Sequence, residues 1–182
     1  MPELRTPRLL LRHWQETDLP AFAAMNADPE VRRWFPGTQT RDESDATARH
    51  LERHFASHGF GFWAVEVNDG AAFVGFVGLQ HVNFEAPFAP AVEIGWRLAR
   101  AHWGKGYAAE AARAALAYAF GPLGLREIVS FAVAGNNASR RVMERIGMRR
   151  DVDGDFEHPL LEVGHPYRRH VLYRVRREMV QA

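Results

Sequence analysis

The chemistry that is easiest to read from this sequence lies in a short glycine-containing segment, Trp103-Gly104-Lys105-Gly106-Tyr107-Ala108. A strand-like run over residues 91–98 precedes it, and an alanine-rich helical run over residues 108–120 follows it. A glycine turn that opens a helix directs unpaired backbone N–H groups and the positive end of the helix dipole at one point. Because that point attracts anions, the segment predicts a phosphate-binding site.

Several kinds of loop share such a turn. A P-loop is excluded because Gly106 is not followed by Lys and then Ser or Thr. A dinucleotide-binding loop matches formally at Gly104, Gly106 and Ala109, but the next strand-like run ends without the carboxylate that would bind a ribose. Two alternatives remain for the segment by itself. One is an ordinary loop at a glycine-rich helix start, and the other binds the pyrophosphate of an acyl-coenzyme A.

A second segment, residues 136–148, is typical of a short capped helix. Asn136 or Asn137 suits the N-cap position, and Gly147 suits the position after the last turn. An apolar stripe at helical spacing is formed by Ala138, Val142 and Ile146.

With these motifs the chain resembles the GNAT N-acetyltransferases, in the RimJ/RimL-like branch of ribosomal-protein N-terminal acetyltransferases. The matching motifs are LRTPRLLLRHW, EIGWRL, WGKGYAAEA and NNASRRVMERIGM, in that order, and the resemblance covers nearly the whole chain. The resemblance implies one domain over residues 1–182 that uses acetyl-CoA to acetylate a primary amine, and a possible homodimer. It also implies an α+β fold whose mixed, mostly antiparallel central sheet is splayed at the cofactor site and flanked by helices. The pattern of elements agrees with helices around such a sheet.

The resemblance implies which residues bind acetyl-CoA. In the family the sheet splits near residues 93–98 and the pantetheine arm lies in that gap, so the expected contacts there are Ile94, Gly95, Trp96 and Leu98. The pyrophosphate is expected on Trp103, Gly104, Lys105, Gly106, Tyr107 and Ala108, and the arm on Asn136 and Ser139. Trp103 departs from the family, where Gln or Arg is common at that position. Since backbone N–H groups hold the phosphate, this exchange removes only one side-chain contact.

The reaction route follows from the absence of cysteine. The chain has no cysteine, which excludes a thiol nucleophile, disulfides and Cys-based metal sites. The simplest route is therefore direct transfer from acetyl-CoA to an amine in a ternary complex. At pH 7 an α-amine is about 14% neutral but a lysine side chain only about 0.04%, so a peptide or protein N-terminal α-amine needs much less help from a base. No metal is expected.

Glu93 is the first candidate for the general base, because its strand runs beside the expected thioester. The alternative is an ordinary surface or hydrogen-bonded carboxylate. His81 is the second candidate, and it can equally be a polar strand end. Many GNAT enzymes carry a Tyr acid at the position of Met143, so that Tyr is absent here. Ser139 matches a Ser of RimL-like members and could protonate the leaving thiolate, unless its hydroxyl only belongs to the first turn of a helix.

Aromatic and titratable residues are candidates for the acceptor site. The family lines its acceptor cleft in the region of Trp34 and Phe35, although core or lid packing is the alternative for both. Phe84, His158 and His170 could also face that cleft. Acceptors other than an N-terminal α-amine remain open, including a small amine such as an antibiotic or a polyamine. A catalytically silent acyl-CoA-binding module is the alternative from outside the enzymes.

Composition limits the partners. The net charge of the 182 residues is +1, so no overall field directs the chain to nucleic acid or membrane. No apolar run approaches about 18 residues. The first eighteen residues contain five charged side chains that argue against a signal peptide, namely Glu3, Arg5, Arg8, Arg12 and Asp18. We therefore expect a cytoplasmic protein. The stripe of His50, His54 and His58 could hold zinc but is more typical of a solvated helix face.

Local signals predict the remaining elements. Thr17-Asp18 is expected to cap one helix, Asp28-Pro29 to start a second short one, and Thr40 to Glu43 to form a capping box for a third. A hairpin is expected over residues 60–82 with its turn at 68–70, and a last hairpin from residue 149. The final strand is expected to be a solvated edge strand, or else to contact an acidic acceptor, through Arg168, Arg169, Arg174, Arg176 and Arg177.

Overall fold

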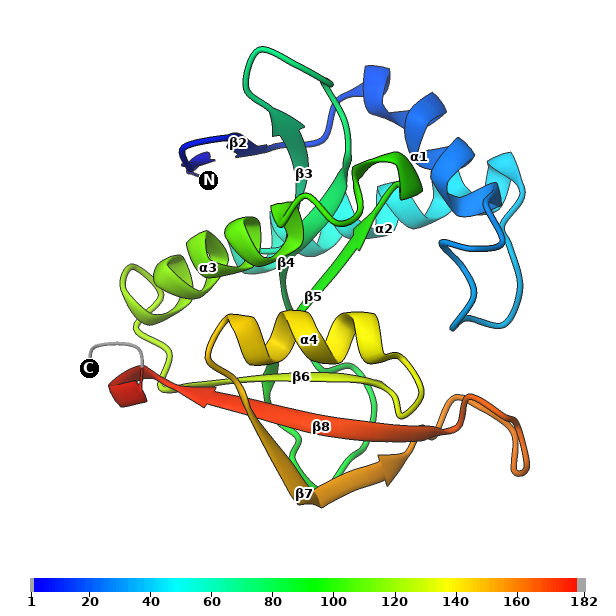
Figure 1. Ribbon diagram of the computed structural model, residues 1–182, viewed down its shortest axis with the longest axis vertical. Helices are drawn as coiled ribbons and strands as arrows, with labels where there is room; N and C mark the ends of the chain where they lie inside the picture. Colours follow the sequence, from blue (N-terminus) through cyan, green and yellow to red (C-terminus); the bar gives the residue numbers. More distant parts are fainter. Residues whose placement is uncertain (1, 180–182) are drawn as a thin grey trace. The chain divides into compact units, whose positions relative to one another are not determined.

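The computed structural model describes residues 2–179 and has the α+β fold that the sequence predicts (Figure 1). Its described residues contain four α-helices and an eight-stranded sheet in the order β1-β2-β3-β4-β5-β6-β8-β7. The β5 and β6 pair is parallel, and the other pairs with an assigned register are antiparallel. The chain divides into two compact units, Met1–Gln80 with Gly95–Ala115, and His81–Ile94 with Leu116–Ala182. Strand β5 (Val92–Leu98) and helix α3 (Tyr107–Phe120) continue from one unit into the other.

The first unit contains the N-terminal strands and two helices that pack on each other (Figure 1). Its elements are β1 (Leu4–Arg5), β2 (Leu9–Arg12), η1 (Glu16–Asp18), α1 (Leu19–Ala27), α2 (Arg41–His58), β3 (Phe62–Val67), β4 (Gly75–His81) and η2 (Arg100–His102). The expected hairpin is confirmed, because β3 and β4 are antiparallel and Gly70 closes the turn onto Val67. Side chains such as Leu9, Phe22 and Trp63 are 0% exposed and form the core.

The start of α2 follows the local signal. The Thr40 hydroxyl accepts a hydrogen bond from the Glu43 N–H at 3.3 Å, and the Glu43 carboxylate accepts from the Thr40 N–H at 2.8 Å, which confirms the capping box. The short helix expected at Asp28-Pro29 is wrong, because residues 29–34 form turns and residues 35–37 form bends. There the Asp28 carboxylate accepts from the Glu30 N–H at 2.8 Å. A side chain that binds nearby backbone in this way competes with a helix.

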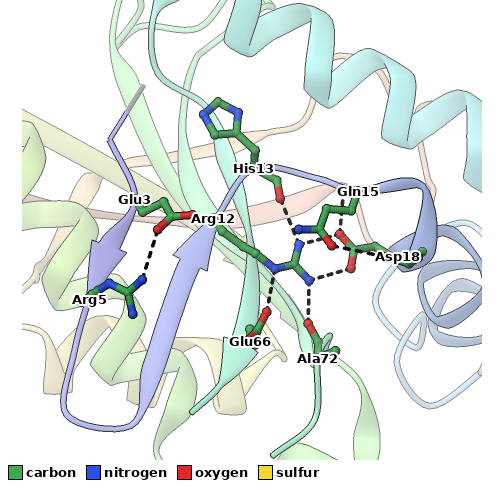
Figure 2. Close-up of polar contacts among 9 residues, drawn as sticks. Glu3, Arg5, Arg12, His13, Gln15, Asp18, Glu66 and Ala72 are labelled. Atoms are coloured by element: carbon green, nitrogen blue, oxygen red, sulfur yellow. Dashed lines mark hydrogen bonds and ion pairs between the residues drawn. The ribbon is translucent and has the colours of Figure 1, made fainter. Parts of the chain in front are cut away.

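Arg12 organises the polar core of the first unit (Figure 2). It is only 4% exposed, and its guanidinium forms two hydrogen bonds with Asp18 and one with Glu66, each of 2.8 Å. It also donates to the Ala72 carbonyl at 2.7 Å. The hydrogen bonds to Asp18 and, more weakly, to Glu66 raise the pKa of Arg12, although burial lowers it. Asp18 makes no side-chain cap on α1 itself, but its carboxylate accepts from the Gln15 N–H at 2.9 Å in a capping box at the start of η1, directly before α1. The capping role is therefore confirmed one turn earlier than expected, and the same carboxylate also binds Arg12.

The second unit holds the C-terminal hairpin. Its elements include β6 (Glu127–Val133), α4 (Asn137–Arg145), β7 (Arg149–Glu157), β8 (Arg169–Arg176) and η3 (Arg177–Met179). The expectation that the basic final strand is an edge strand is wrong, because β8 pairs with β6 on one side and β7 on the other (Figure 1). The Arg174 guanidinium binds Asp151 at 2.6 Å and Glu127 at 2.7 Å. Ion pairs with neighbouring strands thus neutralise Arg174, and similar pairs are made by Arg168, Arg169 and Arg176.

Candidate functional site

The predicted phosphate loop has the backbone that its function requires. Gly104 and Gly106 have φ angles of 74° and 82°, in the left-handed region that favours glycine. The Glu110 N–H donates to the Gly106 carbonyl at 3.1 Å, so α3 starts immediately after the second glycine. The first four N–H groups of such a helix have no partner within it. A Cβ on Gly104 would meet no atom within 4 Å, so the backbone there is open to a ligand. The loop therefore fits a pyrophosphate.

A charged pair from distant parts of the first unit fixes this loop. The Arg8 Nε donates to Glu110 at 2.6 Å, and its Nη1 donates to the Lys105 carbonyl at 3.0 Å. The Arg8 guanidinium also lies 4.9 Å from the ring centroid of Tyr107. Burial raises the pKa of Glu110, but hydrogen bonds from Thr6 and Arg8 outweigh it and lower the pKa overall. Arg8 and Glu110 thus hold both the loop and the first turn of α3 to the start of β2.

The Trp103 side chain forms a hydrogen bond within the protein. Its indole N–H donates to the Leu98 carbonyl at 2.8 Å, which ties the loop to the end of β5, although 46% of the residue is exposed. The Leu98 side chain belongs to the core. On the same strand, a Cβ on Gly95 would lie 3.2 Å from the Phe62 ring, so glycine allows the close approach. Trp96 is half-buried.

The first half of β5 belongs to the second unit. Glu93 is half-buried and lies opposite Val129 in the parallel pair of β5 with β6. Ile94 is 1% exposed, and its carbonyl accepts a hydrogen bond from the Ser130 hydroxyl at 2.9 Å. A contact of Ile94 with the cofactor stays a prediction, as do those of the other β5 residues.

The start of α4 is built as the sequence predicts. Asn136 is the N-cap, and its Oδ1 accepts from the Ser139 N–H at 3.2 Å. A contact between Asn136 and the cofactor arm would therefore use its amide NH₂. The helix ends with Gly147 at a φ of 87° and a bond of 3.0 Å from the Met148 N–H to the Met143 carbonyl, a Schellman motif. Of the expected apolar stripe, Ile146 is 5% exposed and Val142 is half-buried, whereas Ala138 is exposed. Met143, which lies outside the expected stripe, is 1% exposed.

Three predicted acceptor residues gather in one aromatic cluster of the second unit. The His158 ring lies 4.6 Å from Phe84 and 4.9 Å from His170. Burial, with a smaller contribution from His170, lowers the pKa of His158 to about 4. Burial also lowers the pKa of His170. Both rings are therefore neutral at pH 7. His81 lies exposed at the end of β4.

The two remaining acceptor candidates lie in the first unit among arginines. Phe35 is 37% exposed, and the guanidinium carbons of Arg97 and Arg32 lie 4.2 Å and 4.7 Å from its ring centroid. Trp34 is half-buried, and the guanidinium carbon of Arg33 lies 5.6 Å from its ring centroid.

No local spacing signals Arg8, Glu110 or Arg97, because Glu110 lies 102 positions from Arg8 and Asn26 lies 71 positions from Arg97. Arg32, by contrast, has local partners in Phe35 and Gly37.

Between residues 2 and 179, no group of three or more His, Cys, Asp or Glu side chains could hold a metal ion. His54 and His58 stack on each other with ring centroids 4.3 Å apart. Among the helices in that range, none has the length and apolar character needed to cross a membrane.

Comparisons with known proteins give the family. A sequence model of the acetyltransferase (GNAT) domain matches residues 8–149. The chain is 31% identical over 150 residues to the uncharacterized N-acetyltransferase YnaD of Bacillus subtilis, covering 81% of this chain and 83% of that protein. The crystal structure of an acetyltransferase from Agrobacterium tumefaciens has a TM-score of 0.76 at 31% identity, covering 96% of this chain and 94% of the other.

A more distant structure shares the fold alone. Mycobacterium smegmatis RimJ in complex with CoA-disulfide has a TM-score of 0.75 at 23% identity, covering 100% of this chain and 88% of that one.

The chain belongs to the GNAT acetyltransferase family. It is an acetyl-CoA-dependent N-acetyltransferase that acts on an amine.

Proposed function

We propose that this enzyme acetylates the α-amine of a peptide or protein N-terminus by direct transfer in a ternary complex, as a RimJ/RimL-like member of the family. The observation that carries the proposal is the loop from Gly104 to Ala108, which the Arg8–Glu110 pair fixes at the start of α3. Residues 1–182 then act as one catalytic domain. The near-neutral charge and the lack of cysteine in the sequence fit a cytoplasmic enzyme.

In this proposal, different groups of the chain bind different parts of acetyl-CoA. Acetyl-CoA supplies an activated acetyl group as a thioester. The backbone N–H groups from Gly104 to Ala108 hold the pyrophosphate, and the Asn136 amide NH₂ holds the arm. A backbone N–H near Gly95 or Trp96 polarises the acetyl carbonyl, as the family resemblance implies.

Two side chains handle protons in this proposal. Glu93, half-buried on β5, takes the proton from the amine, either directly or through water. Ser139, in the first turn of α4, gives a proton to the leaving thiolate. The capping bond of Asn136 uses the backbone N–H of Ser139, so the Ser139 hydroxyl is not part of that cap.

The acceptor is proposed to contact Trp34 and Phe35 in the first unit and Phe84, His158 and His170 in the second. The rings of the second unit are uncharged at pH 7 because burial lowers the pKa of both histidines. Neutral aromatic surface with few polar groups suits an extended peptide. These rings also provide no strong base that would deprotonate a lysine side chain.

The test compares two peptides of the same length. One has a free α-amine and no lysine, and the other has a blocked α-amine and one lysine. We expect the free α-amine peptide to have the higher kcat/KM between pH 7 and 8, measured as release of free thiol from acetyl-CoA. Faster acetylation of the blocked lysine peptide contradicts the proposal. Release of thiol that does not depend on any amine would indicate hydrolysis and not acetyl transfer.

A further inference from the structure

Arg97 is a half-buried cation whose hydrogen-bonded side-chain partner is neutral. It lies on β5, and its Nη1 donates to the Asn26 Oδ1 at 2.9 Å. The Asn26 side chain in turn donates to the Ser44 hydroxyl at 2.9 Å. Asn26 in α1 and Ser44 in α2 are both 0% exposed. A chain of neutral hydrogen bonds therefore connects Arg97 to both helices without a counter-charge.

The other contacts of Arg97 are aromatic rings and a second cation. Its guanidinium carbon lies 4.2 Å from the ring centroid of Phe35 and 5.3 Å from that of Phe76. Arg32 contacts the same Phe35 ring at 4.7 Å, and its Nε donates to the Gly37 carbonyl at 2.8 Å. Cation–π contacts weaken the penalty for burying a guanidinium but do not neutralise its charge. Two positive groups thus meet at one partly exposed ring.

Among the described residues, no carboxylate pairs directly with either arginine. Burial lowers the pKa of Arg32 overall, although the charge of Glu43 acts on Arg32 and raises that pKa. Within residues 2–179, neither Arg97 nor Arg32 has an ion-pair partner within 4.0 Å, and the buried Nε of Arg97 has no hydrogen-bond partner. Burial and then the charge of Arg32 lower the pKa of Arg97 to about 9, so it remains positive at pH 7. A buried ion without a partner destabilises a fold.

The same unit contains the opposite case. Arg12 is 4% exposed and its guanidinium binds two carboxylates, those of Asp18 and Glu66 (Figure 2). This is the usual arrangement, because buried charges in proteins are paired. The contrast shows that the first unit can supply acidic partners to a buried arginine, and that it supplies none to Arg97.

We propose that Arg97 and Arg32 bind a carboxylate of the amine acceptor next to Phe35, so that the preferred substrate is an acidic peptide N-terminus. This proposal rests on the proposed function, which supplies the peptide. A guanidinium donates several N–H groups in a plane and suits a carboxylate. Phe35 is part of the connection between α1 and α2, and its exposed face gives the peptide access. Polycationic amines such as spermidine would be repelled.

The test uses pairs of peptides that differ only in charge. Short peptide amides carry one Asp at the first, second, third or fourth position, and the control peptides carry Asn at the same place. The α-amine, length and shape are then closely matched. We expect at least one Asp peptide to have a kcat/KM about 10- to 100-fold above its Asn partner, the effect of hydrogen bonds to a charged group. Spermidine should be a poorer acceptor than any of these peptides.

Variants assign the preference to the two arginines. In Arg97→Met and in Arg32→Gln the ratio of Asp to Asn rates should fall towards one, and Arg97→Lys should retain part of it. Arg53→Gln removes an exposed positive charge from α2 of the same unit and should keep the full ratio. Stabilisation by coenzyme A, measured as a rise in Tm, shows which variants are folded. If Arg97→Met does not fold, the ratio of Asp to Asn rates in Arg32→Gln decides whether the arginines recognise the carboxylate.

Two results would overturn the proposal. Equal rates for every Asp and Asn pair in the wild-type enzyme would show that no carboxylate is recognised. A preference that persists in both Arg97→Met and Arg32→Gln would place the recognition elsewhere. If no amine is acetylated while coenzyme A still binds, the proposed function fails. The carboxylate site is then judged by whether the Asp peptides raise Tm more than the Asn peptides do.

Discussion

Arg8 and Glu110 are 102 positions apart in the chain, yet their side chains meet at 2.6 Å beside the predicted phosphate loop. One carboxylate oxygen of Glu110 also accepts from the Thr6 hydroxyl at 2.6 Å and from the Arg8 N–H at 3.0 Å. The first turn of α3 is thus anchored to the residues that precede β2. This anchor makes the shape of the phosphate loop depend on the N-terminal segment.

Replacing Arg8 by Ala should weaken the binding of acetyl-CoA. The loop loses its bond from Arg8 to the Lys105 carbonyl, so the KM for acetyl-CoA should rise about 10-fold, as expected for one charge-assisted hydrogen bond. The KM for acetyl-pantetheine, which has no pyrophosphate, should not change. Arg5→Ala, which breaks only an exposed ion pair with Glu3, is the control. Equal effects on both acyl donors would show a general loss of structure.

Gly106→Val should abolish the rise in Tm that coenzyme A causes. A valine strains the backbone at a φ of 82° and blocks the approach of the pyrophosphate. Gly164→Val has the same kind of strain at a φ of 86° but lies in the loop between β7 and β8. It should lower Tm without removing the effect of coenzyme A. A folded Gly106→Val enzyme that coenzyme A stabilises normally would refute the loop assignment.

Glu93→Gln and Ser139→Ala separate the two proton transfers. If Glu93 is the base, its variant should lower kcat/KM by roughly 10²–10⁴ and remove the acidic limb of the pH profile. If Ser139 is the acid, its variant should lower kcat while the affinity for coenzyme A is kept. Near-normal rates in both variants would leave the positioning of the two substrates as the main source of catalysis.

The histidine cluster should make stability depend on pH. Burial lowers the pKa of His158 to about 4, below its value of about 6.5 in the unfolded chain. The unfolded state therefore binds more protons between these two values, and the free energy of unfolding should fall as the pH is lowered from 6.5 towards 4. His158→Phe should show a smaller fall in Tm between pH 7 and pH 5 than the wild type. The exposed His50→Gln is the control, and an identical fall in His158→Phe would contradict the assignment.

The sequence determined the elements whose signals lie within a few residues. The capping box of Thr40 with Glu43 and the cap of Asn136 on Ser139 join residues three positions apart, so they form wherever those residue types meet a helix start. The glycines of the phosphate loop act in the same way, because the conformation of a single residue decides their role. The motif order also identified the family, whose fold the structure confirms.

Only the tertiary structure decided which charged side chains pair with one another. Asp18 caps the start of η1 as a local signal would predict, but only packing showed that the same carboxylate also pairs with Arg12. Strand β8 proved to be internal because β7 pairs along its outer side. The partnership of Arg8 with Glu110 and the unpaired charge of Arg97 depend on which distant segments meet. Electrostatic contacts act over a few ångströms in space and carry no fixed spacing in sequence. Local patterns therefore predicted helices, turns and the phosphate loop, and only the folded chain showed how its arginines are used.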